Sequence, residues 1–538
     1  MNTLCAVLID VPSIQNYVYS GNRLKENVGA SYLVQEIYGA YLQEAIDKTF
    51  GYNIVDINAW RRKPGSILMR EQENLPCEVG YIGGGNALLL FKYEGDEKCK
   101  AKELIQNWTL ILLEKVPGLA TAVAIKRINI EDLVNNYQNE MSDLFQTLAE
   151  NKSKYYPNTT FSKHGITADC KYSGLTAEVF HEGFDDEEPG YISCVSKAKL
   201  KASEDSKRFL EEKFKDELEG KYTFASLFSE FGQTDGSNHI AIVYIDGNKM
   251  SSKFRKCKDL VETRELSIAV QKATDNSFKQ LIKEDVIKNM GFYLDSGLKF
   301  KKDDEHKQIL PIRPIVLSGD DITFVCNGKL GVYLAERFIN HFSSQSIGSL
   351  NNLTACAGIA ITKTKYPFFR GYELSEELCQ QAKSKSREYG DTSWLDFHIV
   401  YGGFVGNLQS IRSRQFNTVN GNLHFGPYRI DNDNDNKSFY YIKRGIDIFR
   451  DNEKWPRSKL MEFRSLLHHT DVEIKEFIES MQNRGLLLPE LNEGSQYHKK
   501  GWENKETPYF DMIELMDFYL SPEQTDKKTG GESDENKN

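Results

Sequence analysis

The sequence predicts an α/β (α+β) protein in which one strand–hairpin–strand unit occurs twice. An apolar run that ends in Asp246 is followed 74 residues later by the turn of an apolar hairpin at 314–326. An apolar run that ends in Asp10 is followed 75 residues later by the turn of a similar hairpin at 80–91. A further apolar strand begins 36 residues past the turn in the first copy and 34 residues past it in the second. Three landmarks in the same order favour a repeat over two unrelated α/β segments.

The two copies differ in the chemistry of the hairpin turn. The second copy has Asp320 and Asp321 where the first has Gly85 and Asn86. With Asp246 from the neighbouring strand end, the second copy offers the oxygen ligands that Mg²⁺ and Mn²⁺ prefer, and these suit two-metal phosphoryl chemistry. We therefore expect a pair of metal ions in the second copy, whereas the first copy is degenerate because its turn lacks acids.

Backbone groups near these acids are also candidates. The carbonyl of Ile245 or Gly247 is expected to complete the metal shell, since Mg²⁺ accepts backbone oxygen and keeps several waters. Asp321 binds the second ion or, alternatively, ties down the hairpin backbone. The simplest alternative for any Asp beside a Gly at a strand end is a turn former.

Glycine-rich turns and a basic helix face are candidate nucleotide contacts. The turn at Gly84, Gly85 and Asn86 allows close approach of backbone to a nucleotide, or is only a tight hairpin loop. Lys383 and Arg387 lie four residues apart in a predicted helix and share one face. They are expected to bind triphosphate, and the alternative is a solvated basic face.

Composition limits the class of protein. At 538 residues, the chain is expected to form about three or four domains. Its net charge of −10 argues against a protein that coats nucleic acid by itself. We expect no membrane span and no signal peptide, because no run of 18 apolar residues occurs and no charged N-terminal region precedes an apolar stretch. Nine cysteines without a CxxC pair fit free thiols in a reducing cytoplasm.

Pattern and composition divide the chain into five parts. Apolar periodicity predicts strands at 3–10 and 120–127 and helices at 29–50, 98–116, 330–344 and 375–390. The expected parts are an α/β unit at 1–130, a mostly helical connector at 131–235, a second α/β unit at 236–400, a helical region at 401–520 and a disordered tail at 521–538.

Two histidine-containing segments are interpreted as structural. His164, Cys170, His181 and Cys194 have irregular spacing and no paired ligands, so no zinc is predicted there. The segment 468–471 reads His-His-Thr-Asp, and it is interpreted as the N-terminus of a helix rather than a metal site.

These motifs together resemble the large polymerase/cyclase subunit of type III CRISPR effector complexes, in a Cmr-like form. More distantly they resemble the GGDEF nucleotidyl cyclases. The resemblance is carried by residues 10–37, 244–250, 318–321, 357–390 and 395–400, where the turn Ser318-Gly319-Asp320-Asp321 replaces the usual Gly-Gly-Asp-Asp.

The resemblance implies two ferredoxin-like palm domains packed face to face, with a helical connector and a helical C-terminal domain. It also implies that Asp246 and Asp320 hold catalytic metals and that Lys383 contacts triphosphate. Ser318 and Gly319 lie where the nucleotide approaches, and Ser318 is small enough to be tolerated there.

By the same resemblance, the chain joins ATP molecules into cyclic 3′–5′ oligoadenylate messengers for antiviral defence. Synthesis is switched on by target RNA within an assembled complex, so the partners are other effector subunits and, indirectly, guide and target RNA. No HD nuclease domain is recognised, so DNA cleavage is not expected from this chain. The alternatives are an inactive scaffold subunit, an adenylyltransferase acting on another small acceptor, and a free-standing dinucleotide cyclase.

Overall fold

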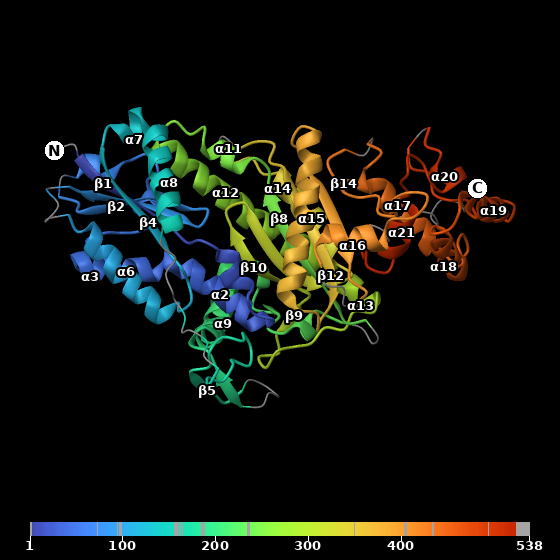
Figure 1. Ribbon diagram of the computed structural model, residues 1–538, viewed down its shortest axis with the longest axis horizontal. Helices are drawn as coiled ribbons and strands as arrows, with labels where there is room; N and C mark the ends of the chain where they lie inside the picture. Colours follow the sequence, from blue (N-terminus) through green and yellow to red (C-terminus); the bar gives the residue numbers. More distant parts are fainter. Residues whose placement is uncertain are drawn as a thin grey trace, which may run out of the picture.

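The computed structural model contains the repeat as two sheets of matching strand order (Figure 1). The first sheet runs β2-β3-β1-β4, and the second runs β10-β11-β8-β12-β13-β14. The first four strands of each sheet have the ferredoxin-like order, so the predicted fold class is confirmed. The strands are β1 (Thr3–Asp10), β2 (Cys77–Gly83), β3 (Asn86–Lys92), β4 (Ala122–Asn129), β8 (His239–Gly247), β10 (Ile312–Ser318), β11 (Asp321–Asn327), β12 (Ala355–Lys363), β13 (Trp394–Ile399) and β14 (Tyr428–Arg429).

The structure describes most of the chain between residues 3 and 522. The ranges it describes are interrupted at 73, 94, 96–98, 155–159, 161–162, 164, 184–188, 234–236, 349, 403–405, 433–434 and 493. Of the tail predicted to be disordered, 521–538, only the first two residues fall within the described part.

The repeat extends to the register and to a bulge in each hairpin. In the first unit Asp10 pairs with Asn86, and in the second Asp246 pairs with Asp321. The β2–β3 hairpin shifts register between Val79 and Tyr81, and the β10–β11 hairpin shifts between Pro314 and Val316. Both shifts lie at the same distance from the turn, so the two units match residue by residue around the acids.

Helices cover the sheets in the same order in both units. The predicted helix at 98–116 is α6 (Ala101–Lys115), the helix at 330–344 is α14 (Gly331–Ser343), and the helix at 375–390 is part of the longer α15 (Phe368–Glu388). α15 crosses one face of the second sheet over β8 and β12 (Figure 1). In the first unit, α8 (Tyr137–Lys154) covers β1 and β4 in the same way.

The single helix predicted at 29–50 is wrong. Two helices occupy this segment, α2 (Leu24–Ile37) and α3 (Ala40–Phe50). The break falls at Gly39, whose φ of −100° and ψ of −115° are not helical. Glycine loses little by leaving the helical region, whereas the apolar periodicity continues across it and conceals the break.

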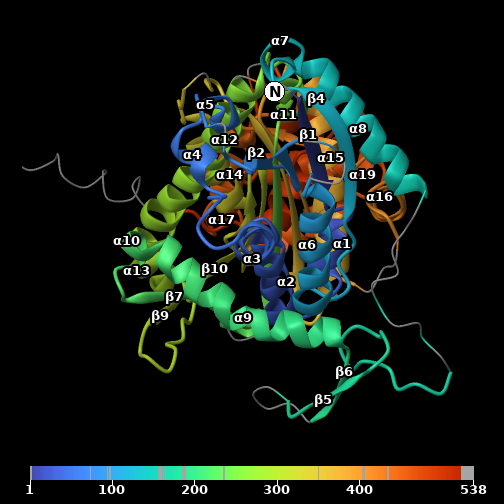
Figure 2. The ribbon, with the colours of Figure 1, turned by 90° about the vertical axis from the view of Figure 1, so that its left-hand side faces the viewer.

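The segment predicted as a connector, 131–235, contains α8, a second long helix and small β-elements. α9 (Cys194–Lys213) packs along α2, and the β5–β6 hairpin projects from this edge of the molecule (Figure 2). The remaining short elements are α7 (Asp132–Asn135), α10 (Lys215–Leu218), β5 (Val179–His181), β6 (Gly190–Ile192), β7 (Tyr222–Phe224) and β9 (Gln308–Leu310). Domain boundaries at 130, 235 and 400 remain predictions.

The first long helix of each unit donates a hydrogen bond to the β-bulge of the other unit. Arg264 of α12 (Leu260–Gln280) is fully buried, and its Nε donates to the carbonyl of the bulge residue Gly80 at 2.5 Å. Its Nη2 bonds to Glu78 of β2 at 2.7 Å, and Glu78 is also buried. In the opposite direction, the Ser31 hydroxyl of α2 donates to the carbonyl of the second bulge residue, Ile315. The two units are therefore joined by a pseudo-twofold pair of backbone contacts.

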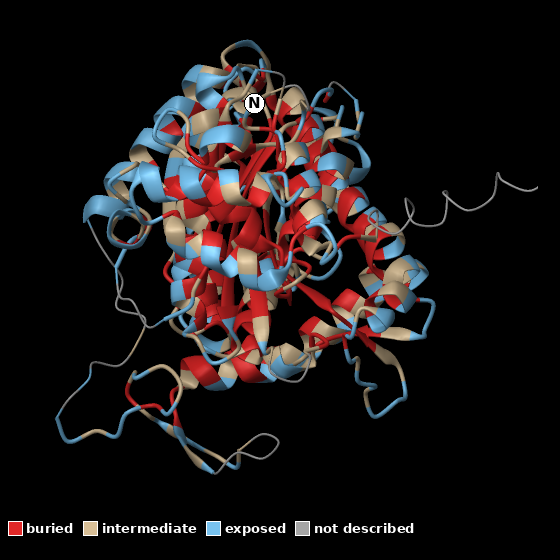
Figure 3. Cartoon of the chain, turned by 90° about the vertical axis from the view of Figure 1, so that its right-hand side faces the viewer, coloured by how far each residue is buried: buried red, intermediate tan, exposed pale blue. Residues whose placement is uncertain are grey.

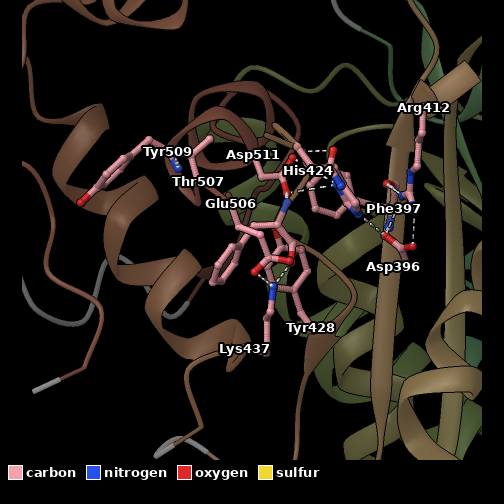
Figure 4. Close-up of polar contacts among 12 residues, drawn as sticks. Asp396, Phe397, Arg412, His424, Tyr428, Lys437, Glu506, Thr507, Tyr509 and Asp511 are labelled. Carbon is pink, nitrogen blue, oxygen red and sulfur yellow. Dashed lines mark hydrogen bonds and ion pairs between the residues drawn. The ribbon is translucent and has the colours of Figure 1, made fainter. Parts of the chain in front are cut away.

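The C-terminal region is attached to the second sheet through a buried polar network (Figure 4). Asp396 of β13 accepts two hydrogen bonds from Arg412, each 2.9 Å, and one contact from His424 at 2.8 Å. The other ring nitrogen of His424 lies 3.2 Å from Asp511. Burial acts against ionisation, but Arg412 and His424 hold the pKa of Asp396 well below its ordinary value. The helices here are α16 (Leu408–Gln415), α17 (Phe439–Arg450), α18 (Arg457–Leu466), α19 (Asp471–Gln482), α20 (Tyr497–Lys500) and α21 (Tyr509–Leu515).

Buried residues are concentrated on the strands and on the inner faces of the helices (Figure 3). All nine cysteines are free thiols. Within the described ranges, no helix combines the length and the apolar character needed to cross a bilayer.

Candidate functional site

The three predicted carboxylates come together at one end of the second sheet. Asp246 ends the apolar strand β8, and Asp321 begins β11 directly opposite it. Asp320 lies in the turn between β10 and β11, after Gly319, which has a φ of +59°. Ser318 is exposed at the end of β10 and pairs with Asp321. The hairpin therefore presents its acids beside Asp246, as the sequence predicts.

Gly247 gives this turn room to fold over the end of β8. A Cβ atom on Gly247 would lie 2.9 Å from the Cβ of Asp320. The N–H of Gly247 donates to the carbonyl of Asp320 at 3.1 Å. Ile245 is paired with Ile322 on one side and Ala357 on the other, so its backbone belongs to the ladder. Metal binding by the carbonyl of Ile245 or Gly247 remains a prediction.

Helix α12 clamps the turn with two side chains that sequence analysis missed. The Gln271 side-chain oxygen accepts from the N–H of Gly319 at 2.9 Å, and the Thr274 hydroxyl donates to the carbonyl of Gly319 at 2.5 Å. The two side chains lie three residues apart and so share a helix face. No signal in the sequence distinguishes them, because Arg264, Ser267 and Asp275 are also polar residues on this face of α12. These two hydrogen bonds hold the turn that carries Asp320 and Asp321 against α12.

Lys383 lies in the site, in a different contact from the one predicted. Its ammonium forms an ion pair with Asp246, and the side chains are 15% and 22% exposed. The alternative of a solvated basic face therefore does not hold for Lys383, which is largely covered and bound to a carboxylate. Its contact with triphosphate remains a prediction. Arg387 is exposed one turn further along α15, and no ion pair of it is found within the described part of the chain.

A second lysine near the turn was not predicted. Lys253 lies on α11 (Met250–Phe254), just after the Asp246 strand. Burial lowers the pKa of Lys253, while the neighbouring carboxylates of Asp320 and Asp391 act in the opposite direction. A half-buried ammonium beside the turn is suited to bind phosphate when a nucleotide is present.

The carboxylates are held where ionisation is unfavourable without a cation. Burial, followed by the charge of Asp246, raises the pKa of Asp320 to about 6. Burial, together with Asp246 and Asp320, raises the pKa of Asp321 to about 8. Burial also raises the pKa of Asp246, against the effect of Lys383. Desolvation and like charge both disfavour a carboxylate, and both would be relieved by a bound divalent ion.

The residues present fit a divalent ion, although they are not assembled into a finished shell. The Oδ1 atom of Asp321 is buried and has no hydrogen-bond partner, which is costly unless a ligand supplies one. In the part of the chain that is described, no group of three or more His, Cys, Asp or Glu side chains is placed close enough to hold a metal ion. Asp246 faces the Lys383 ammonium instead. An ion bound to Asp246 would therefore compete with Lys383 for this carboxylate.

The first unit has the same turn geometry as this site, but its turn contains no acid. The turn residues Gly84 and Gly85 have φ of +59° and +79°, and Asn86 faces Asp10. The carboxylate of Asp10 is 2.5 Å from the ammonium of Lys152 on α8, as that of Asp246 is paired with Lys383 on α15. Both lysines are the sixteenth residue of their helices. The repeat thus includes α8, which lies in the segment 131–235 predicted as the connector, and the ion pair between Lys152 and Asp10.

An aromatic stack links the first unit to the acids of the second. Tyr19 of α1 (Ile14–Tyr19) stacks on Tyr372 of α15, with ring centroids 3.7 Å apart. Tyr372 meets the edge of Tyr244, which lies two residues before Asp246 on the same face of β8. No sequence pattern linked Tyr19 to the second unit, because the contact spans more than 350 residues.

The remaining histidine and cysteine predictions are settled in part. The segment 468–471 precedes α19, where Thr470 and Glu473 form a capping box, so its interpretation as a helix N-terminus is confirmed. Cys170 and Cys194 are free thiols, and His164 lies outside the described residues.

Comparison with known proteins gives a family match and several structural likenesses. Residues 239–389 match the family model described as Cas10/Cmr2, second palm domain. The structure is similar to that of a Csm1–Csm4 cassette in complex with AMPPNP, with TM-score 0.53, 13% identity and coverage of 95% of this chain and 69% of that chain. A search of curated proteins by sequence finds no match.

Two further structures show the same likeness. The Csm1–Csm4 cassette in complex with cA4 has TM-score 0.50 and 12% identity. The Csm1–Csm4 subcomplex in the type III-A CRISPR-Csm interference complex has TM-score 0.50 and 11% identity. Each likeness covers 96% of this chain and 69% of the other. The predicted resemblance is therefore confirmed: residues 239–389 match the second palm domain of Cas10/Cmr2, and the chain has a fold similar to that of Csm1.

Proposed function

We propose that this chain is a Mg²⁺- or Mn²⁺-dependent nucleotidyltransferase that uses ATP to make cyclic 3′–5′ oligoadenylate-type messengers. The difference between the two units carries the proposal. Asp246 faces Asp321 in the second unit, whereas Asp10 faces Asn86 in the first. The second unit therefore concentrates unbalanced negative charge where the first does not. Similarity to structures with bound AMPPNP and cA4 supports a nucleotide as the ligand.

Different residues of the second unit would bind the metal ions, bind the phosphates and position the turn. Asp246, Asp320 and Asp321 would hold two divalent ions, which when bound neutralise the triphosphate and activate the attacking 3′-hydroxyl. Lys383 and Lys253 would bind the phosphates of the donor ATP. The turn clamp from α12 keeps Asp320 and Asp321 in place during the in-line displacement, in which pyrophosphate leaves as the new phosphodiester forms.

The first unit would hold the acceptor nucleotide. Its turn at Gly84 and Gly85 allows backbone to approach a ligand closely. The same turn has Gly85 and Asn86 in place of the two acids, so this unit would bind a nucleotide without a metal ion. Catalysis is then confined to the second unit, and the acceptor hydroxyl is presented to it from the first.

The likeness to Csm1 suggests the setting of this activity. One similar structure is part of a type III-A interference complex, so we propose that this chain also works beside other effector subunits, with guide and target RNA held by the assembly. Nine free cysteines are compatible with a reducing cytoplasm. Transfer of AMP to a different small acceptor would use the same acids, and mass spectrometry of the product with and without such acceptors separates the two reactions.

Calorimetry tests the proposal against an inactive scaffold. The specific observation in favour of a scaffold is the ion pair that Lys383 forms with Asp246, which neutralises one predicted metal ligand. We expect ATP binding that requires Mg²⁺ and is lost in Asp246→Ala but kept in Asp10→Ala, the matched change in the first unit. ATP binding that is indifferent to Mg²⁺ and to Asp246→Ala would favour the scaffold.

Truncation of Lys383 is expected to weaken ATP binding. Lys383→Ala removes a charge-assisted contact to phosphate worth about 1.5–3 kcal/mol, which corresponds to roughly ten- to a hundredfold in affinity. Lys385→Ala is the matched control on the same helix, because Lys385 is exposed and paired with Glu388. Equal ATP affinity for Lys383→Ala and Lys385→Ala, at one metal concentration, would show that Lys383 serves only its contact with Asp246.

A further inference from the structure

Glu376 lies on the face of α15 that covers the acid site. Three neighbours on this helix contact the acid-bearing strands. Tyr372 meets Tyr244 of β8, the Cys379 thiol donates to the carbonyl of Cys356 at 3.2 Å, and Lys383 pairs with Asp246. Glu376 is four residues after Tyr372 and three before Cys379, so it shares their face. Its carboxylate is therefore directed to the same side of the second sheet as Asp246 and Asp321.

Glu376 differs from its acidic neighbours on α15 in its polar contacts. It is half-buried, and within the described ranges no hydrogen bond or ion pair of its carboxylate is found. Its neighbours are engaged elsewhere, since Glu373 pairs with Arg370 at 3.2 Å and Glu377 accepts from the N–H of Leu408 at 2.5 Å. Burial, and then the charge of Asp246, raises the pKa of Glu376. A half-buried carboxylate facing another acid is unfavourable without a cation.

The first unit has no carboxylate at the position that corresponds to Glu376. The ion pairs of Lys152 and Lys383 align α8 with α15, and this alignment places Phe145 at the position of Glu376. The first unit thus has Phe145, Gly85 and Asn86 where the second has Glu376, Asp320 and Asp321. All three differences add a carboxylate, and all three lie at one place in the fold.

Two buried polar atoms without hydrogen-bond partners lie on the side of the second sheet that α15 covers. The Oδ1 atom of Asp321 and the hydroxyl of Tyr372 are buried without hydrogen-bond partners, and Tyr372 is only 4% exposed. Both lie on the α15 side of the second sheet, where Glu376 is found. Buried polar groups normally find a partner, so this side is built to receive a polar or charged ligand.

We propose that Glu376 is a further carboxylate of the divalent-cation site in the second unit. It would act with Asp246 and Asp321, directly or through a metal-bound water, once Lys383 turns from Asp246 towards a phosphate. This inference rests on the proposed metal-dependent function, and it adds a ligand from a helix to those from the strands. A ligand on α15 would also couple the position of this helix, and hence of Tyr372 and Tyr19, to cation binding.

Direct measurement of Mn²⁺ binding to the full chain tests this role. Electron paramagnetic resonance reports free Mn²⁺ and needs no turnover. Glu376→Gln keeps the size of the side chain and removes its charge, and it is expected to weaken Mn²⁺ binding tenfold or more. Glu373→Gln, on the exposed side of the same helix, is expected to bind Mn²⁺ as the parent protein does. Unchanged Mn²⁺ affinity in Glu376→Gln would overturn the inference.

One more variant separates this inference from the function on which it rests. Asp321→Asn is expected to weaken Mn²⁺ binding at least as much as Glu376→Gln. If Asp321→Asn weakens binding and Glu376→Gln does not, only the role of Glu376 fails. If the parent protein binds Mn²⁺ no better than Asp321→Asn does, the metal site itself fails, and the inference fails with it.

Discussion

Replacement of Asp321 by Asn is expected to make the metal-free protein more stable while it removes the response to metal. Burial and the neighbouring carboxylates of Asp246 and Asp320 disfavour the charge of Asp321, and each unit by which they raise its pKa corresponds to about 1.4 kcal/mol. An amide of the same shape carries no charge. Since about 1 kcal/mol shifts Tm by roughly 2–4 °C in a domain of this size, a rise of several degrees is expected.

The stability gained by Asp321→Asn depends on pH, because the pKa of Asp321 is raised in the folded protein. Burial and the neighbouring acids raise the pKa of Asp321 to about 8 in the folded protein, above an unfolded value of about 3.9. The folded state therefore holds a proton that the unfolded state has lost, and the wild-type protein loses stability from this group as pH rises from about 4 to 8. The advantage of Asp321→Asn should grow over that interval.

Thermal unfolding in EDTA and in Mn²⁺ measures both effects. Mn²⁺ should raise the Tm of the wild-type protein and leave Asp321→Asn nearly unchanged, because binding to the folded state alone stabilises it. Asp10→Asn is the matched control, and it should not gain stability, since Asp10 is already paired with Lys152. A lower Tm for Asp321→Asn in EDTA at pH 8 would contradict the account.

Truncation of Arg264 is expected to be the most destabilising single change. Its guanidinium is fully buried and bonds to the carbonyls of Ser66, Val79 and Gly80 and to the buried carboxylate of Glu78. Arg264→Ala leaves Glu78 charged and buried, which costs about 3–5 kcal/mol. Because all of these partners belong to the first unit, the loss falls on the contact between the units.

Denaturant unfolding with a double-mutant cycle measures this effect. Adding Glu78→Gln to Arg264→Ala should recover part of the loss, since the unpaired charge is then absent. Arg70→Ala is the control, because the pair of Arg70 with Glu131 is exposed and such pairs contribute about 0–1 kcal/mol. A loss for Arg264→Ala no larger than that for Arg70→Ala would show that the units are held together by apolar contacts alone.

The repeat and its acid difference could be predicted from the sequence because local patterns carry them. Apolar runs ending in Asp10 and Asp246, each followed by a short hairpin turn, determine both the strands and their register. The break at Gly39 was missed because the helical periodicity continues across it. Arg264 was missed because nothing in its own helix shows that its partners lie more than 180 residues earlier.

The same limit applies within the site. Asp246, Asp320 and Asp321 were found because each lies next to a strand that fixes its position. Lys383 was found from its spacing with Arg387 on a predicted helix and from the resemblance, but its contact with Asp246 depends on how α15 crosses the sheet. Lys152 and Glu376 lie among many charged residues on helices, and only the packing of α8 and α15 distinguishes them from solvated neighbours.

The central claim is that the acids of the second unit transfer nucleotides from ATP. Its most direct test is product analysis by mass spectrometry, with ATP and Mn²⁺ or Mg²⁺, for the chain alone and with its effector partners and target RNA. We predict pyrophosphate and a new 3′–5′ phosphodiester for the wild-type protein, and neither for Asp320→Asn/Asp321→Asn. Undiminished product formation by that double variant would contradict the account.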